Sequence, residues 1–545
     1  MASTDDDDNV QTLLASVCAK AEEIIQRTAS LLSEYQQYND LRQKRHNEIQ
    51  IPGQKTLVQS VKAEHIAFQR TLEELQSESF LKEHDESEAL TRLKKIRSAL
   101  QCSNVPSLET AWDVVKHCHG LDRLTYKFSR HANVGKCPIC KGQKKCPPKG
   151  QQDSKSVVWV DAVVKGGAEW LRIIGIEEKR LLMHMAQGGW DWEVGSDSED
   201  EEMDEDSDIS VVVTVRQLIE AALVNRHEYK PPRLRIMFTR IVEGSNSEVD
   251  RLIRQMRGMG REGVEVQIVC SNSDFLMTPP PSLEVALENL MVDDTKDITS
   301  VVNLDCSILV SLASDVTHSH VEIQPWHRND VSAQIREEEA EGSSLVKKLY
   351  PALRGKKLVC TAEAARRFRA IVATIATKDE AARTRLILPD PGSLEKTSTE
   401  LVAELQALSV HPVGSGLLLP VEVVDHDYPA RMHEIMGTGK LPLSAKPVAA
   451  DLSELNWDIF CYGWVAGITT ITANYTLAKQ IVRLVEQGRT EAHEEGPKVW
   501  VFPYTRALAT KGRPEQPPDS PRKLNKGFRK GIRKHAAGEN EALQI

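Results

Sequence analysis

Apolar residues recur along the chain with two different periods, which separate predicted helices from predicted strands. Over residues 9–38 and 54–77 they return every three or four positions, which indicates two long amphipathic helices. Pro52 and Gly53 break the chain between them, so we expect an antiparallel helix pair. Over residues 156–175, two runs of alternating and β-branched residues flank a Lys-Gly-Gly turn and predict a β-hairpin.

The following stretch has the element order of a small α/β layer. We expect helices at 177–187, 213–224 and 246–259 and strands at 234–241 and 264–270.

From residue 298 onward, strands and helices alternate repeatedly. Thr397 and Glu400 form a capping-box pattern, so one helix should begin there. Repeated alternation of this kind implies a parallel sheet with helices on both faces. The expected strands are 300–305, 357–360, 468–473 and 498–502, and the expected helices are 306–314, 330–350, 362–376, 456–467 and 475–488.

Composition divides the 545 residues into segments of different character. An acidic run without apolar residues has nothing to bury, so it predicts a disordered insertion, and a Pro-rich acidic stretch predicts a linker. We expect an N-terminal domain at 1–195 that continues at 209–275, the acidic insertion at 196–208, the linker at 276–297, a C-terminal domain at 298–510 and a basic disordered tail at 511–545.

The net charge of −10 is clustered in these segments, so no overall basic field argues for nucleic acid. The chain begins MASTDDDDN, which is unlike a secretory signal. No apolar run reaches the roughly 20 residues of a membrane span. The ten cysteines form no dense framework, which is typical of reduced thiols. We expect a protein of the cytoplasm or nucleus that is neither secreted nor embedded in a membrane.

Two apolar strands deliver polar residues to their carboxyl ends. Asp305 ends the first, and Thr472 and Asn474 end a later one. In open α/β sheets, ligands and metals bind at this edge. Several carboxylates converging there would hold Mg²⁺ or Mn²⁺ and activate water for phosphodiester cleavage. A structural alternative is that Asp305 and Thr472 only satisfy the N-termini of the helices that follow.

These strands belong to a larger resemblance. The segments VNLDCSILVSLASDVTH, KKLVCTAEAARRFRAIVATI, GITTITANYTLAKQIV and KVWVFPYTRALA occur in one order, and VWVDAVVKGGAEWLRIIG precedes them. Together they look like the eukaryotic domain-of-unknown-function 1308 (DUF1308) family, over most of the chain. The C-terminal segments also resemble the PIN-like fold of metal-dependent ribonucleases. The resemblance implies an α/β protein with a C-terminal PIN-like parallel sheet and flanking helices, preceded by a helical hairpin and a small α/β domain.

The resemblance also implies a catalytic set of Asp305, Asp458, Thr472 and Asn474, with Mg²⁺ or Mn²⁺ on the two aspartates. Asn474 stands where a nuclease usually carries an acid, and its amide brings no charge to a cation. The middle helix offers Glu363 as a further acid. Two hypotheses follow: a metal-dependent RNA phosphodiesterase, or a catalytically inactive scaffold for RNA or protein partners.

A second metal candidate lies in a Gly- and Lys-rich loop, where Cys137, Cys140 and Cys146 follow a CPxC pattern. A structural zinc ion takes four ligands, and the fourth would come from Cys118, His117, His119 or His131. The alternative is an exposed loop with reactive thiols.

Two further motifs complete the set. The glycines of GMGREG at 258–263 follow a helix and precede a strand, the reverse of a dinucleotide fingerprint, so we expect no cofactor-binding residues. The basic tail has three interpretations: it contacts RNA phosphates, it is a nuclear localisation signal, or it only increases solubility.

Overall fold

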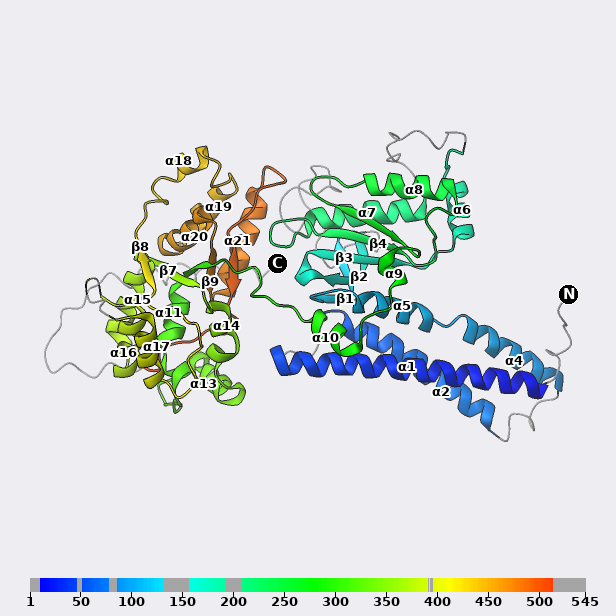
Figure 1. The fold of residues 1–545 in the computed structure, drawn as a ribbon, viewed down its shortest axis with the longest axis horizontal. Coiled ribbons are helices and arrows are strands. Elements are labelled where there is room, and N and C mark those ends of the chain that lie inside the picture. Colours follow the sequence, from blue (N-terminus) through cyan, green and yellow to red (C-terminus); the bar gives the residue numbers. More distant parts are fainter. Residues whose placement is uncertain are drawn as a thin grey trace, which may run out of the picture. The chain divides into compact units, whose positions relative to one another are not determined.

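The computed structural model describes residues 10–46, 51–77, 86–131, 156–192, 208–390, 392 and 396–512. Packing divides the chain into two units, coloured by sequence in Figure 1. The first unit comprises Met1–Thr299, Asp427–Thr470 and Tyr475–Val499, and the second comprises Ser300–His426, Ile471–Asn474 and Trp500–Ile545.

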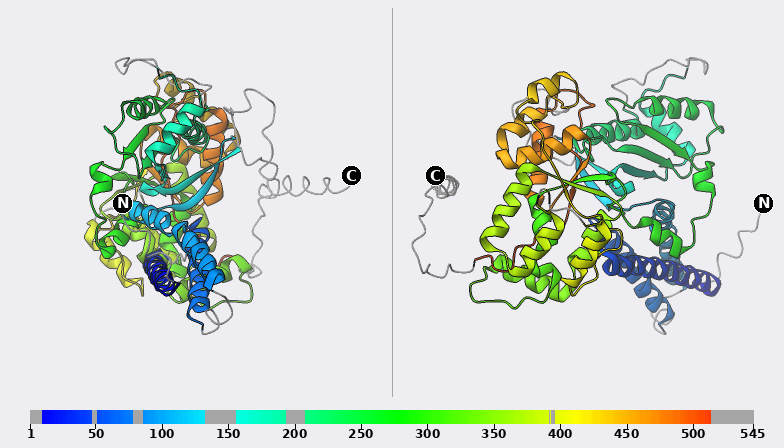
Figure 2. Two further views of the ribbon diagram at one scale, coloured as in Figure 1. Left: turned by 90° about the vertical axis from the view of Figure 1, so that its right-hand side faces the viewer. Right: turned by 60° about the vertical axis from the view of Figure 1, so that its left-hand side comes forward.

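The first unit opens with a layer of helices, as the helical period predicts. The layer contains α1 (Val10–His46), α2 (Gln54–Gln76), α4 (Glu86–Gln101) and α5 (Val105–Lys116). Figures 1 and 2 show α1 and α2 lying side by side, so the predicted helix pair is confirmed. Val61, Phe68 and Leu75 of α2 are buried. His65 lies on the same stripe, and its Nδ1 is 2.7 Å from Oγ1 of Thr28 on α1.

A mixed five-stranded sheet follows, in the order β1 (Arg123–Ser129), β2 (Val157–Val164), β3 (Glu169–Ile174), β4 (Arg233–Phe238) and β5 (Val266–Cys270). The predicted hairpin is β2 and β3, which are antiparallel, and β3, β4 and β5 are parallel. The small α/β layer is therefore confirmed. Strand β1, which pairs with β2, was not predicted.

Helices cover both faces of this sheet (Figure 1). α6 (Glu178–Gln187), α7 (Ser210–Val224) and α8 (Ser247–Gly258) contribute to the core on one face, and α1, α2, α5 and α10 (Leu283–Leu290) to the core on the other. Part of the segment predicted as a linker is thus helical, because Leu287 and Leu290 are buried in this core. The first unit also holds α18 (Met432–Gly437), α19 (Ala445–Asp451), α20 (Glu454–Ala466) and α21 (Tyr475–Gly488).

A second five-stranded sheet is parallel, as the strand and helix alternation implies. Its order is β10 (Val499–Val501), β9 (Thr469–Thr472), β6 (Val301–Leu304), β7 (Lys357–Thr361) and β8 (Glu422–Val424). Every residue of β9, and all but the first residue of β6 and of β7, is buried. Central parallel strands are covered on both faces, which explains why they read as continuous apolar runs. The short edge strand β8 was not predicted.

The helices of the second unit begin where their capping residues predict. α15 (Ala362–Ile375) starts after Thr361, whose Oγ1 accepts the N–H of Ala364, and α17 (Ser398–Ala407) starts at the predicted capping box. The single helix predicted at 330–350 is wrong. α13 (Asn329–Glu341) ends because Gly342 adopts a φ of +77°, and a π-helical turn (Leu345–Leu349) and α14 (Tyr350–Leu353) follow.

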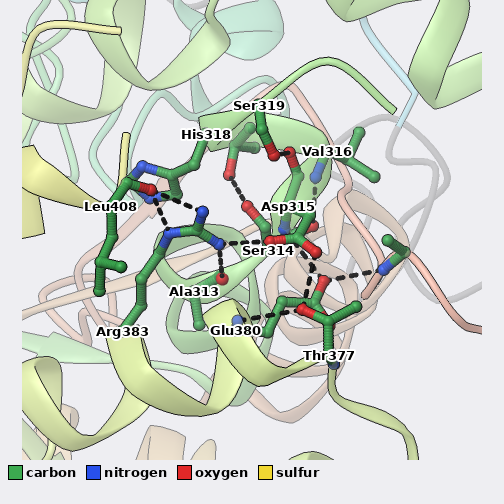
Figure 3. A network of polar contacts seen from close by, with 12 residues as sticks. Ala313, Ser314, Asp315, Val316, His318, Ser319, Thr377, Glu380, Arg383 and Leu408 are labelled. Atoms are coloured by element: carbon green, nitrogen blue, oxygen red, sulfur yellow. Dashed lines mark hydrogen bonds and ion pairs between the residues drawn. The ribbon is translucent and has the colours of Figure 1, made fainter. Parts of the chain in front are cut away.

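A buried polar network holds the carboxyl end of α11 (Cys306–Ala313), as Figure 3 shows. Arg383 of α16 (Lys378–Ile387) is 2% exposed. Its guanidinium donates to the main-chain oxygen of Leu408 at 2.9 and 2.6 Å, to that of Ala313 at 3.1 Å and to Oδ1 of Asp315 at 2.6 Å. One side chain thereby joins α11, α16 and the segment after α17.

Glu380 completes the network on the same helix. Its Oε1 accepts the N–H groups of Asp315 at 3.0 Å and Ala509 at 2.8 Å, and its Oε2 accepts the N–H of Thr377 at 2.9 Å. Burial raises the pKa of Glu380 even though three N–H groups favour the charged form. The network thus anchors the segment that follows β10 to α16.

Candidate functional site

The ends of β6 and β9 bring Asp305 and Thr472 into direct contact. Oγ1 of Thr472 and Oγ of Ser307 both donate to Oδ2 of Asp305, each at 2.7 Å. Ser307 Oγ accepts the N–H of Ala473 at 2.9 Å, and Thr472 Oγ1 accepts the N–H of Asn474 at 3.0 Å. Because each hydroxyl accepts a main-chain N–H, its own hydrogen is directed to the carboxylate. The four bonds orient the Asp305 side chain.

Sheet geometry explains this meeting. β6 and β9 are neighbours, and the N–H of Asp305 donates to the main-chain oxygen of Ile471 at 3.0 Å. Residues that follow parallel strands therefore meet at one edge. Asp305 precedes α11, but its carboxylate makes no capping hydrogen bond; its main-chain oxygen accepts the N–H of Ile308 at 2.9 Å instead. The reading of Asp305 as a capping side chain is therefore wrong.

One oxygen of Asp305 remains available to a ligand. The residue is 7% exposed, and among the described residues only Oδ2 of its two carboxylate oxygens makes a hydrogen bond. Asn474, two residues after Thr472, is exposed at the same edge. Oδ1 of Asp305 is thus a group through which this edge can meet solvent or a bound molecule.

The donors around Asp305 do not match what a two-metal centre requires. Such a centre takes several carboxylates, whereas Thr472 and Asn474 bring no charge. Within the described ranges, no group of three His, Cys, Asp or Glu side chains is placed to hold a metal ion. Glu363, on the first turn of α15, forms an ion pair with Arg366, which lowers the pKa of that carboxyl. Its side chain is committed to this neighbour.

Cys306 lies beside Asp305, and its thiol is partly buried and hydrogen-bonded to the main chain. Its Sγ donates to the main-chain oxygen of Ala364 at 3.3 Å. Burial, and after it the charge of Asp305, raises the pKa of Cys306 to about 12. The thiolate is the nucleophilic form of cysteine, so this residue offers no nucleophile near neutral pH.

Asp458, the other acid of the expected catalytic set, lies on α20 in the first unit. It is partly buried, and its charge adds to the burial that raises the pKa of Cys461 to about 12. Its joint action with Asp305 stays a prediction.

The predicted zinc ligands Cys137, Cys140 and Cys146 lie outside the described residues, so that site also stays a prediction. One candidate for the fourth ligand, Cys118, belongs to the hydrophobic core, and its Sγ donates to the main-chain oxygen of Val114 at 3.4 Å. Burial raises the pKa of Cys118 to about 12. Zinc binding at Cys118 would require both core access and loss of this proton. Most of the acidic insertion and of the basic tail also lies outside the described residues.

Ser307 is the residue of this edge that the sequence reasoning missed. It stands two positions after Asp305, on the first turn of α11. The spacing Asp-x-Ser after a buried strand was the available signal, because a hydroxyl on the first helical turn can reach back to a side chain at the strand end.

Comparison with known protein families finds a match over part of the second unit. Residues 302–406, which span most of β6 and all of α11, β7 and α15, match the family described as "Protein of unknown function (DUF1308)". No curated protein and no solved structure matches the chain. The described part of the chain contains no helix that is long and apolar enough to span a membrane.

Proposed function

We propose that the protein binds RNA without cutting it, and that its second unit, in which residues 302–406 match the DUF1308 family, is a PIN-like domain. The observation that carries this proposal is the state of Asp305, a single carboxylate held by the hydroxyls of Ser307 and Thr472, with Asn474 in place of a second acid. Hydrolysis of a phosphodiester by two metal ions needs several carboxylates at one edge. RNA as the ligand rests on the resemblance of these strands to PIN-like ribonucleases, and a fold alone does not set an activity.

A second candidate function is a metal-dependent RNA phosphodiesterase. It is favoured by Oδ1 of Asp305, which makes no hydrogen bond within the described residues while Oδ2 is held in place. Asp305 and Asp458 would hold Mg²⁺ or Mn²⁺ there, and Thr472 and Asn474 would complete the site.

One experiment separates the two functions. The purified protein is melted in EDTA and in 1 mM Mn²⁺, as wild type, as Asp305→Asn and as the exposed control Asp294→Asn. A cation whose dissociation constant is one hundredth of its free concentration would stabilise the folded state by about 2.7 kcal/mol. The proposal predicts no Mn²⁺ shift that depends on Asp305, no cleavage of labelled RNA, and equal RNA binding by all three proteins.

The opposite result is equally clear. A Mn²⁺ shift and an RNA cleavage activity that are both lost in Asp305→Asn, but kept in Asp294→Asn, would establish the phosphodiesterase and overturn the non-catalytic proposal. Failure of the wild type to bind any RNA would overturn both.

A further inference from the structure

A cleft of about 1090 Å³ lies in the first unit, and neither Asp305, Thr472 nor Asn474 is among its lining residues. Its walls come from β1, from the segment between α7 and β4, and from α21. Lysines and arginines outnumber aspartates and glutamates among its lining residues. The cleft therefore has an excess of positive charge, in contrast to the negative charge of the whole chain.

Two arginines form the interior of the cleft. The side chains of Arg226 and Arg489 are 7% and 10% exposed. Both donate to the main-chain oxygens of Tyr229 and Ala492, at 3.2 to 3.4 Å. The carboxylate that they share is Glu486, which lies 2.6 Å from Arg489 and 3.9 Å from Arg226.

This arrangement leaves a positive charge that a bound anion would balance. Two guanidinium groups share one carboxylate in a mostly buried place. Burial, and after it the charge of Arg489, lowers the pKa of Arg226, as expected for two like charges held close together. Planar guanidinium groups match the oxygens of a phosphate, so a phosphodiester is a fitting anion.

Strained backbone shapes the wall of the cleft. Glu228 and Tyr229 have φ values of +46° and +69°, and Glu262 has a φ of +50°. Non-glycine residues in this region cost about 1–3 kcal/mol each and are concentrated at ligand clamps and active sites. Gly167 faces the same segment, and a Cβ added there would lie 2.4 Å from Nδ1 of His227. The backbone conformation of the cleft wall therefore lowers the stability of the folded state.

The rim offers unpaired cations. Arg261 and Arg483 are exposed, and within the described ranges their side chains make no hydrogen bond or ion pair. They are free to contact a ligand without breaking a bond that the fold uses.

An aromatic ring of the cleft lies beneath a cation. Tyr126 of β1 lines the cleft, and the guanidinium of Arg123 lies 4.5 Å from its ring centre. Proteins that bind single-stranded nucleic acid combine such rings, on which bases stack, with a positively charged groove that follows the phosphates.

We propose that this cleft binds single-stranded RNA, with phosphates on Arg261, Arg483 and the buried arginine pair, and a base against Tyr126. The choice of RNA rests on the proposed function, whereas the site uses residues of the first unit only. An acidic peptide would meet the same cations but has no base to stack on the ring of Tyr126, so nucleic acid is the better match.

Fluorescence anisotropy of a labelled 12-nucleotide oligouridylate tests the proposal on the full chain. The variant R261E/R483E is compared with wild type and with R70E/R180E, which makes the same charge change at exposed arginines of α2 and α6. We expect the cleft variant to bind at least tenfold more weakly and the control to bind within twofold of wild type. Each lost phosphate contact should lower the salt dependence, the slope of log K against log salt, by about 0.7.

Stacking has its own test. Tyr126→Leu, which keeps an apolar side chain there, should weaken binding at least fivefold without changing the salt dependence, because a ring contributes no charge. Competition with polyglutamate of equal charge distinguishes the ligand class. If it displaces the oligonucleotide as well as unlabelled oligouridylate does, the assignment to nucleic acid is overturned.

The assay separates failure of the cleft from failure of the proposed function. Binding by R261E/R483E at wild-type strength overturns the cleft alone, whereas an absence of binding by wild type overturns the cleft and the proposed function together. If Asp305→Asn is the one variant that loses binding, the RNA site lies at the sheet edge and the cleft proposal is overturned. Cleavage of RNA by wild type overturns the non-catalytic function and leaves the cleft intact.

Discussion

Replacement of Arg383 by methionine removes the centre of the network in Figure 3 while it keeps an unbranched chain in the space. The guanidinium is the hydrogen-bond donor that reaches the main-chain oxygens of Leu408 and Ala313, and it is the cation that pairs with Asp315. The side chain is 2% exposed, so water cannot take its place without a change in packing.

The magnitude follows from what the variant leaves behind. Two main-chain oxygens lose a buried donor, and each such loss costs about 1–3 kcal/mol. Asp315 keeps one hydrogen bond, from Oγ1 of Thr377 at 2.7 Å, but loses its cation. Removal of one partner of a buried ion pair costs about 3–5 kcal/mol in all. We expect Arg383→Met to lower the free energy of unfolding of the second unit by this amount.

Because a chain of two units need not unfold in one step, the assay must report on the second unit alone. Hydrogen exchange of the amides of α11 and α16, measured against urea concentration, does so. The control is Arg385→Met, since Arg385 is exposed on the same helix and should change stability by no more than about 0.5 kcal/mol. A loss below about 1 kcal/mol for Arg383→Met, or equal losses for both variants, would refute the reasoning.

Two further predictions concern single positions. Burial and, after it, the charge of Arg383 lower the pKa of His318 to about 3. Below pH 6.5 the unfolded chain therefore binds a proton at this residue that the folded chain does not bind. Between pH 6.5 and 5 the free energy of unfolding of the second unit should fall by about 2 kcal/mol. Urea unfolding should show that the free energy of unfolding depends less on pH in His318→Gln than in wild type. The exposed control His320→Gln should show the same pH dependence as wild type. Gly167→Ala should destabilise the first unit by at least 1–3 kcal/mol, the usual cost of a strained backbone, because its φ is +120° and the new Cβ would meet His227. Gly189→Ala, at a φ of +76° with open space around it, should shift the melting temperature less, and equal shifts would contradict the clash.

Local pattern was enough for most elements of the fold. The predicted hairpin is β2 and β3, and the strands ending at Asp305 and Thr472 are β6 and β9, because a buried face imposes a period that sequence records directly. Two strands were not predicted. β1 is interrupted by Thr125, with a φ of +42°, and β8 has only three residues at an exposed edge, so neither carries a strong burial pattern.

The sequence by itself also indicated that Asp305 and Thr472 follow strands of a parallel sheet and so lie at its carboxyl edge. Only the tertiary structure decided that these strands are neighbours and that the two residues meet through one carboxylate oxygen, with Ser307 as a second donor. Only the fold brings Arg226 and Arg489 onto the same two main-chain oxygens. Periodicity tells which face of an element is buried, but a polar site depends on the distances between side chains of different elements, and those distances are set by packing.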